Sequence, residues 1–529
     1  MPLNKFFKTR EFKLFLTVWI VYIFYLQMFG HSCMANSQSA LTAAIVNEGR
    51  FKIDTYYKTS CDIAFYDGHY YSGMAPGISF ISAPIYAVSK PLFYLLPQEL
   101  IDFVYEKIED YGAALPVDFE GRKKTPSNYL PDLNKRQILE YIIISGFILP
   151  VFTTSLFSAL SALLLYIILK NFTRNEKLRI IITLAYAFGT LMFLLSTEFF
   201  QRPIAIALMF AAFTILFKIK HKEIKLKGSA LFASGVLAGF SVWFDYFHLL
   251  AAGLLFLYLL SFCRKFNVCK EKRILNLDNR NLLVLKFVIG ILIPVLLLAL
   301  YHTVIFENPF ITPYSYRVYR GDSASGSYNI EPPNAGTIFY MLAFFWYSPI
   351  MLLALYGLYK AFLRKDRYHY DALAISVFVI LTFIYVSIIA FSYPPVLSII
   401  GYDPRYIMPI VPYIMIFLPY IFTGNKPAKN KALKVLFFSF CALSIFMNWA
   451  FAQYSRKMEL YGLNQRQLIA ILYFLKNGPS SSFLRTAADV FHINALLLNL
   501  IGLSALILLL FIIWRPCLGK IRLVARRRH

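Results

Sequence analysis

Apolar runs of roughly 17–25 residues recur along this chain, and each is long enough to cross the hydrocarbon core of a bilayer as a helix. We count about twelve; they begin near Leu14, Tyr141, Leu178, Phe200, Gly228, Phe247, Leu285, Ile338, Ala372, Tyr406, Leu433 and Ile493. At 58% hydrophobic and 15% charged residues, the chain does not have the composition of a soluble globule. The sequence predicts one all-α, polytopic membrane domain over residues 1–529.

The connectors between these runs alternate between strongly basic and nearly neutral or acidic. Lys- and Arg-rich connectors stay on the cytoplasmic side of a membrane, so their positions orient the chain. With both termini cytoplasmic, all of them fall on one side, at residues 170–179, 218–227, 264–273, 360–367 and 426–434 and in the carboxyl tail. This pattern explains the net charge of +25 without nucleic acid and predicts a multi-pass protein of the plasma membrane.

One apolar segment, residues 75–96, conflicts with this orientation if it is counted as a span, because every later connector would change sides. It also holds residues that sit poorly in a spanning helix, namely Pro76, Pro84, Lys90 and Pro91. We therefore predict a helix on the outer membrane surface over residues 75–96, inside a long first extracytoplasmic loop, residues 31–140. Residues 452–492 form the last extracytoplasmic loop in this scheme.

Two of the six cysteines, Cys33 and Cys61, share the first loop. In an oxidising compartment they either form a disulfide that staples the loop or stay as two thiols, and their spacing does not choose between these outcomes. No Cys/His set has the spacing of a metal site, so no metal ligand is predicted. The sequence does not identify a cofactor, and a requirement for a divalent cation stays open.

The densest polar stretch of the first loop runs from Asp54 to Gly77 and holds three carboxylates and a histidine: Asp54, Asp62, Asp67 and His69. A carboxylate at a membrane interface can take a proton from an acceptor hydroxyl as a general base, or help to hold a divalent cation beside a phosphate. The alternative is a solvated loop with ordinary turns, of which Asp67–Gly68 is a typical pair.

Part of this stretch, Asp-Gly-His-Tyr-Tyr-Ser-Gly-Met-Ala-Pro-Gly at residues 67–77, resembles the end of the first outer loop in GT-C glycosyltransferases. These are the bacterial and archaeal relatives of dolichyl-phosphate-mannose protein mannosyltransferases and of lipid A aminoarabinose transferases. The residues that follow, Ser79–Tyr86, fit the same pattern, as do Ala187–Thr190, Phe345–Pro349 and Gly401–Tyr406. The likeness extends to about Pro412, although each motif is short.

This resemblance implies juxtamembrane helices and an active site between the first loop and the membrane. The donor would be a sugar on a polyprenyl phosphate, and the sugar would pass to a lipid, polysaccharide or protein acceptor on the extracytoplasmic face. An acidic residue would act as the base, and basic residues would hold the lipid phosphate. The chain departs from the family where an Asp-Glu pair and an acid-Lys pair are usual: it has Asn36–Ser37 and Gly73–Met74 instead.

These departures leave Asp54 and Asp62 as the candidate catalytic bases, with a turn and a helix N-cap as their structural alternatives. For the phosphate we favour Arg405, because an arginine binds phosphate in a bidentate manner and keeps its charge. Its alternative is snorkelling to the interface. The other predicted substrate-binding residues are Asp67, His69, Tyr70, Arg202, Arg317 and Tyr406, and Arg320, Asp245 and His248 are weaker candidates.

The sequence therefore predicts a membrane glycosyltransferase of the cell envelope that works by a single displacement at the anomeric carbon. A multi-span transporter or flippase is the first rival, since about twelve spans is a common number for transporters. The spans are almost free of charged residues, which speaks against it. A lipid-linked polysaccharide polymerase or ligase is the second rival, because it would use the same class of donor.

Overall fold

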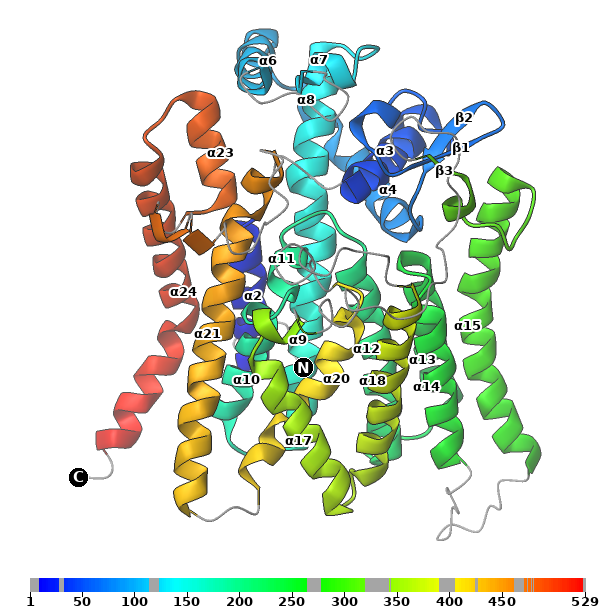
Figure 1. Cartoon of the computed structure of the whole chain (residues 1–529), viewed down its shortest axis with the longest axis vertical. Coiled ribbons are helices and arrows are strands. Elements are labelled where there is room, and N and C mark those ends of the chain that lie inside the picture. Colours follow the sequence, from blue (N-terminus) through cyan, green and yellow to red (C-terminus); the bar gives the residue numbers. More distant parts are fainter. Residues whose placement is uncertain are drawn as a thin grey trace.

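The computed structural model describes residues 9–27, 33–113, 123–263, 277–318, 344–389, 405–423, 427–460 and 480–526, with short pieces at 342 and between 471 and 478. Long helices run side by side through the body of the molecule (Figure 1). They are α2 (Arg10–Phe24), α9 (Leu156–Leu169), α10 (Glu176–Phe188), α12 (Arg202–Lys220), α13 (Gly228–Phe244), α14 (His248–Cys263), α15 (Leu277–Phe306), α17 (Ile350–Arg364), α18 (His369–Ile389), α21 (Pro427–Leu460) and α24 (Ala495–Arg526).

Six helices of the described residues are long and apolar enough to cross a membrane, or seven if one bent pair is counted as a span. This confirms the all-α polytopic class, whereas the number of about twelve spans stays a prediction. Several of the predicted spans form helices with fewer than the ~20 residues that a span needs, such as α10 with 13 residues. The one expected near Tyr406 is broken into η5 (Met408–Ile410), α20 (Val411–Met415) and η6 (Leu418–Phe422). Each piece contains a proline, which removes a backbone donor and interrupts a regular helix.

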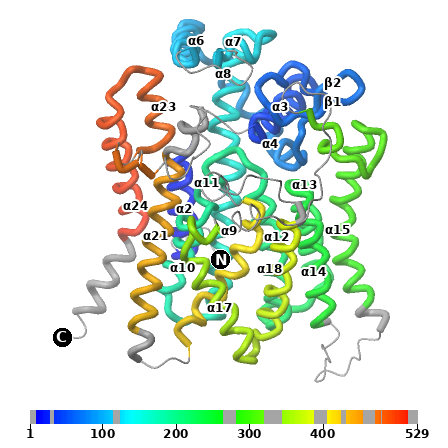
Figure 2. Tube along the Cα trace, viewed as in Figure 1, coloured from blue at the N-terminus to red at the C-terminus, as the bar shows by residue number. Residues whose placement is uncertain are grey.

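The connectors of the bundle separate into two ends of the molecule. The described connectors α9–α10, α12–α13 and α17–α18, which are rich in Lys and Arg, lie at the lower end in Figure 2. The start of α2 lies there too, because Arg10 pairs with Glu176 and Lys170 Nζ lies 2.6 Å from Glu11 Oε1. This is the grouping that the basic connectors predicted; which end faces the cytoplasm stays a prediction.

The first loop folds into a layer at the opposite end (Figure 1). It contains α3 (Cys33–Glu48), η1 (Tyr57–Thr59), β1 (Ile63–Tyr66), β2 (His69–Ser72), α4 (Gly77–Ser89), α5 (Pro91–Tyr94), α6 (Gln98–Ala113) and α7 (Pro126–Tyr129). From there α8 (Lys135–Ile143) continues through two π-helical stretches, η2 (Ile144–Ile148) and η3 (Val151–Ser155), into α9. The segment predicted as a surface helix forms α4 and α5, and α6 turns away from it by 114°. Its placement on a membrane surface stays a prediction.

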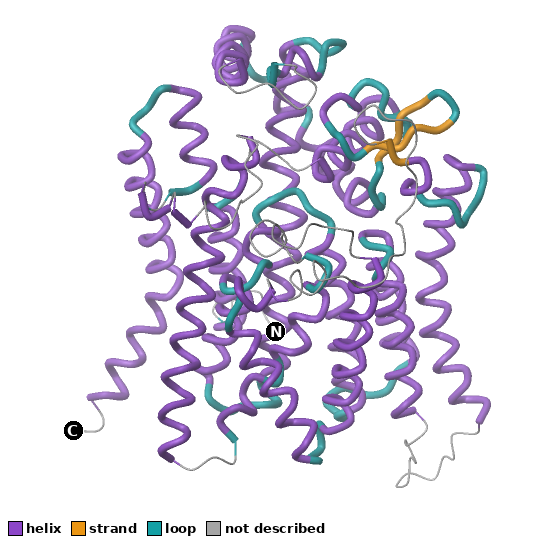
Figure 3. Tube along the Cα trace, in the orientation of Figure 1, coloured by secondary structure: helices purple, strands orange, loops and turns teal. Residues whose placement is uncertain are grey.

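A small sheet, coloured orange in Figure 3, ties this layer to a distant part of the chain. Strands β1 and β2 form a hairpin whose two-residue turn, Asp67–Gly68, has φ angles of 47° and 74°. Both angles are left-handed, as a tight hairpin turn of this length requires. A third strand, β3 (Arg317–Val318), follows η4 (Pro313–Tyr316) and pairs with β1 in the order β2-β1-β3. The residues after α15 therefore reach into the first loop.

The first-loop layer is packed on the bundle through a continuous apolar core. Its own buried side chains, among them Tyr56 and Tyr86, share one cluster with Trp243 of α13 and Tyr301 of α15. The contact is closest at Gly77, where a Cβ atom would lie 2.6 Å from the carbonyl oxygen of Trp243. Only a glycine lets α4 begin so close to the end of α13. This packing fixes the polar residues of the first loop over the upper ends of the bundle helices.

Candidate functional site

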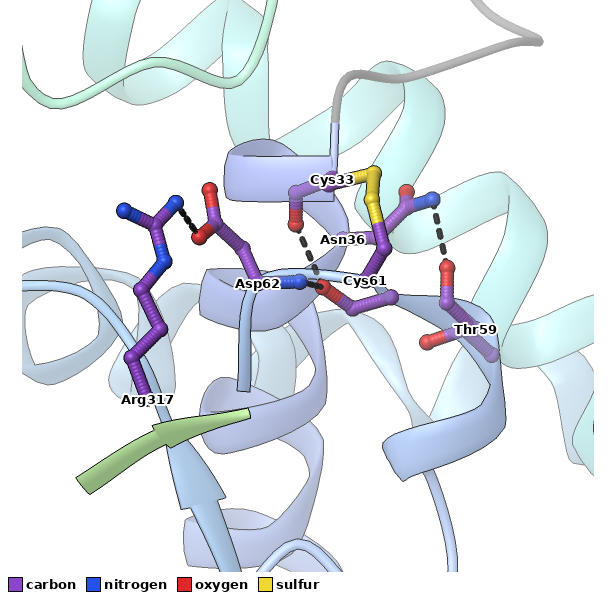
Figure 4. The surroundings of a disulfide bond; sticks show 7 residues. Cys33, Asn36, Thr59, Cys61, Asp62 and Arg317 are labelled. Atoms are coloured by element: carbon purple, nitrogen blue, oxygen red, sulfur yellow. Dashed lines mark hydrogen bonds and ion pairs between the residues drawn. A yellow bond between two sulfur atoms is a disulfide. The ribbon is translucent and has the colours of Figure 1, made fainter. Parts of the chain in front are cut away.

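A disulfide joins the first turn of α3 to the segment that precedes β1. Cys33 and Cys61 are 28 positions apart, and their Cα atoms lie 5.1 Å from each other (Figure 4). Of the two outcomes that the sequence left open, pairing is the one observed. Because Cys61 directly precedes Asp62, the crosslink fixes the backbone of a candidate base to α3.

The side chain of Asp62 is buried and forms an ion pair with Arg317, whose Nη2 contacts Asp62 Oδ1 (Figure 4). The two side chains are 6% and 23% exposed. The pair depends on the sheet, since Arg317 in β3 lies opposite Ala64 in β1. Among the described residues, Asp62 Oδ2 accepts no hydrogen bond, and the buried Nε of Arg317 donates none. One acceptor and one donor therefore remain for a ligand.

The other candidate base, Asp54, holds the beginning of β2. Its Oδ2 lies 2.9 Å from Nδ1 of His69, and its Oδ1 accepts a hydrogen bond from the backbone N–H of Tyr70 at 2.8 Å. The Tyr70 ring stacks on Tyr57 with the ring centroids 4.0 Å apart. Both oxygens of Asp54 are thus engaged within the first loop. Asp67, a predicted substrate-binding residue, is exposed in the hairpin turn.

A second polar cluster lies where α12, the α13–α14 turn and the segment before η5 meet. Arg202 Nε donates to Oδ2 of Asp245 at 2.7 Å, and the two side chains are 6% and 14% exposed. The guanidinium of Arg202 also lies 4.4 Å from the centroid of the Tyr406 ring, and that of Arg405 lies 5.8 Å from the same centroid. Two of the arginines predicted to bind phosphate therefore lie within cation–π distance of the ring of Tyr406, which is itself predicted to bind substrate.

The ion pair keeps Asp245 charged inside this cluster. Burial is the largest single effect and raises the pKa of Asp245, but the lowering effects of Arg202, His248 and the backbone N–H of Phe247 together outweigh it and hold the pKa below its usual range. A neighbouring histidine, His248, is buried at the start of α14, and neither of its ring nitrogens has a hydrogen-bond partner among the described residues. The cluster thus combines the Arg202–Asp245 ion pair with an imidazole, that of His248, whose nitrogens make no hydrogen bond among the described residues.

Two contacts connect the Asp62 pair with the arginine cluster. Gly73 N–H donates to the backbone oxygen of Asp62 at 3.1 Å, and the next residue, Met74, has its sulfur 3.7 Å from Nε2 of Gln201. Gln201 is the neighbour of Arg202 in the chain. On the other side, the ring of Tyr246, next to Asp245, lies 5.7 Å from the ring of Tyr314 in η4, the helical turn that directly precedes Arg317. The two clusters therefore border one region between the first loop and the bundle.

The same contacts explain why residue 73 is a glycine. A Cβ atom at position 73 would lie 2.7 Å from the backbone oxygen of Asp62 and 3.1 Å from the backbone nitrogen of Ile63. A side chain at this position would clash with the Asp62 backbone, so the segment after β2 can approach Asp62 this closely only with a glycine. Met74 is buried against Gln201.

Sequence reasoning missed part of this site. It gave Asp245 and His248 only as weak candidates and did not single out Gln201 as a functional residue. The available signal for Asp245 was a carboxylate between two apolar runs. Arg320 and the motif residues 401–404 lie outside the described residues. In the part of the chain that the structure describes, no group of three or more His, Cys, Asp or Glu side chains has the arrangement of a metal site.

No family model matches the chain, and no curated protein does. Among solved structures, it is similar to the crystal structure of ArnT from Cupriavidus metallidurans bound to undecaprenyl phosphate. That match covers 93% of this chain and 76% of the ArnT chain, with 13% identity and a TM-score of 0.45.

Proposed function

We propose that the protein is an integral membrane glycosyltransferase that moves a sugar from a polyprenyl-phosphate donor to an acceptor on the extracytoplasmic face of a plasma membrane. The acceptor is a lipid, a polysaccharide or a protein. The observation that carries this proposal is an available carboxylate oxygen on Asp62, in a segment that connects through Gly73, Met74 and Gln201 to the cluster that holds Arg202 and Arg405. A base and a phosphate-binding cluster are the two parts that such a transfer requires.

In this proposal Asp62 is the catalytic base. Its Oδ2 accepts the proton of the acceptor hydroxyl, and the oxygen of that hydroxyl attacks the anomeric carbon of the donor sugar. The bond between this carbon and the phosphate oxygen breaks, and the polyprenyl phosphate leaves with the electron pair. A single displacement of this kind inverts the anomeric centre.

The leaving phosphate needs stabilisation by positive charge rather than a separate acid. Arg405 and Arg202, which both lie near the Tyr406 ring, supply that charge. The Nε of Arg317, which has no hydrogen-bond acceptor among the described residues, supplies a further donor next to Asp62. Arginine suits this role because its fork of N–H donors matches phosphate oxygens and its charge does not titrate. Hydrogen bonds from fixed donors to a developing anion are worth more in a site from which water is excluded.

We favour Asp62 over Asp54 as the base because both carboxylate oxygens of Asp54 already contact the hairpin. One lies at hydrogen-bond distance from His69 Nδ1, and the other accepts a hydrogen bond from the Tyr70 amide. To act as a base, Asp54 would have to give up one of these bonds. His69 and Tyr70 then serve the hairpin, and their predicted role in substrate binding is indirect.

A transporter is the second candidate, and one observation favours it. Asp371, in the first turn of α18, is fully buried and lies 2.7 Å from Lys220 Nζ and 2.9 Å from His221 Nε2. Buried ionisable groups inside a helix bundle often mark an ion or proton path. This group lies near the end of the bundle with the basic connectors, whereas Arg202 begins α12 at the other end.

The test is a transfer assay on the purified protein in lipid vesicles, with a panel of radiolabelled polyprenyl-phosphate sugars and membrane extract as the source of acceptor. The proposal predicts that the label leaves the donor and appears in a second product, and that Arg405→Ala weakens this transfer. Asp371→Asn should leave the transfer within a few-fold of wild type. Uptake of a solute or movement of a lipid across the bilayer, without loss of any donor, would instead establish the transporter and give Asp371 the central role.

A further inference from the structure

The segment that carries Asp62 has little regular structure of its own. Between η1 and β1 the chain runs through Ser60, Cys61 and Asp62, which lie in neither a helix nor a strand; the hydrogen bond from Gly73 N–H to the Asp62 backbone oxygen is a further backbone contact. The position of the Asp62 carboxylate must therefore come from specific links to neighbouring elements. Figure 4 shows these links converging on α3.

Three links join the segment to the first turn of α3. The Cys33–Cys61 disulfide is the covalent one. Ser60 Oγ donates to the carbonyl oxygen of Cys33 at 2.6 Å and accepts from the backbone N–H of Asp62 at 2.9 Å. Asn36 Nδ2 donates to the carbonyl oxygen of Thr59 at 2.7 Å. These hydrogen bonds form only while α3 and the segment stay close together, and the disulfide is the covalent bond between them.

The carboxylate of Asp62 is held from the other side by Arg317, which reaches it through a strand of only two residues, Arg317–Val318. A strand this short offers few backbone bonds of its own. A shift of the Asp62 backbone would therefore change the ion pair as well as the direction of Oδ2. The disulfide is also open to chemistry, because Cys61 is exposed and Cys33 is half-buried.

We propose that the Cys33–Cys61 disulfide is a positioning element for the base: it holds Asp62 Oδ2 in the orientation that transfer requires, so that the enzyme works at full rate only in its oxidised form. This inference rests on the proposed function. Disulfides persist in oxidising compartments outside the cytoplasm, so the transferase is active where it faces such a compartment and slow where the bond is reduced. Among the described contacts, none joins the arginine cluster around Tyr406 directly to Cys33 or Cys61, so lipid-phosphate binding survives reduction.

The experiment compares oxidised protein with protein treated with dithiothreitol, which reduces the disulfide to two thiols and is itself oxidised to its cyclic disulfide. A variant with alanine in place of the other four cysteines, Cys263, Cys269, Cys441 and Cys517, excludes effects at those positions and serves as the parent. We expect reduction to lower kcat by about 10-fold or more, since small displacements of a reacting group have effects of this size. The Kd for polyprenyl phosphate should change by less than about 3-fold. A Cys33→Ser/Cys61→Ser variant should have the same kcat as the reduced parent, and dithiothreitol should not change it.

The decisive arm repeats the treatment in an Asp62→Asn background. If the disulfide acts through Asp62, reduction should have little further effect on the residual rate, because the two changes are not additive. An undiminished loss of kcat on reduction in that background would overturn the proposal, and so would equal rates for the oxidised and reduced parent.

Failure of the proposed function gives a different result. In that case the oxidised parent transfers no sugar from any donor, and amide hydrogen exchange becomes the readout. The positioning inference predicts faster exchange on reduction in residues 59–63 and at Arg317–Val318, with the bundle helices unchanged. Unchanged exchange in residues 59–63 would reject the inference whatever the activity of the protein.

Discussion

Arg317 and Asp62 form an ion pair although they are 255 positions apart in the chain. The pair exists because β3 adds to the first-loop hairpin, with Arg317 opposite Ala64 and Val318 opposite Ile63. It links the layer that carries the candidate base to the segment after α15. The two charges are largely removed from water, so each depends on the other for compensation.

Removing the charge of Arg317 should therefore destabilise the protein as well as slow it. Arg317→Gln leaves the Asp62 carboxylate buried without a cation, a change that costs about 3–5 kcal/mol for a well-buried pair and less here because Arg317 is partly exposed. We expect a lower Tm in detergent and a large loss of kcat. Adding Asp62→Asn to this variant should restore much of the Tm and none of the activity. A double variant as unstable as the single one would contradict this account of the pair.

The contribution of the Arg202–Asp245 ion pair to stability should stay constant over the ordinary pH range. Because the pKa of Asp245 is lowered in the folded protein, its carboxylate contributes stability above the ordinary Asp pKa and loses it only as the pH falls through the lowered value. Asp245→Asn should reduce stability by about 3–5 kcal/mol between pH 5 and 8, with a constant difference from wild type. The difference should shrink only in strong acid. Tm measured across this pH range tests the prediction, and a difference that vanishes near pH 6 would refute it.

Asp54→Asn separates the two candidate bases. The change weakens the bonds to His69 and the Tyr70 amide, so the hairpin should lose about 1–2 kcal/mol of stability. Transfer should stay within about 3-fold of wild type, because the base is elsewhere. Asp67→Asn is a matched control for stability, since Asp67 is exposed in the turn and asparagine tolerates its positive φ angle. Loss of transfer in Asp54→Asn with an intact hairpin would return the role of base to Asp54.

Gly73→Ala tests the close approach of β2 to Asp62. The new Cβ would lie 2.7 Å from the Asp62 backbone oxygen, so either the segment after β2 or the segment before β1 has to move. We expect lower stability and a kcat at least about 10-fold below wild type, as a displaced base predicts. Gly253→Ala in α14 is the control, because a Cβ there meets nothing within 4 Å. Equal activity of the two variants would show that the Gly73 contact does not position Asp62.

The broad architecture could be predicted from the sequence because hydropathy and basic connectors act locally. Apolar runs predicted the helices, and Asp67–Gly68 predicted a turn, although not the hairpin that this turn closes. The number of spans could not be fixed in this way, since prolines divide the segment after Tyr406 into short pieces and α10 ends after 13 residues. The ion pairs depend on packing between segments far apart in the chain. No local pattern indicates that Arg317 forms an ion pair with Asp62. Nor does any indicate that Arg202 pairs with Asp245 and lies, like Arg405, near the Tyr406 ring.

The most direct test of the central claim is a single-turnover measurement of sugar transfer by wild type and Asp62→Asn, each loaded with the donor that the panel identifies. The account predicts that Asp62→Asn binds polyprenyl phosphate with nearly wild-type affinity and transfers its sugar at least about 100-fold more slowly, the scale on which a general base contributes. A wild-type rate in Asp62→Asn, with the donor bound and consumed, would show that Asp62 is not the base.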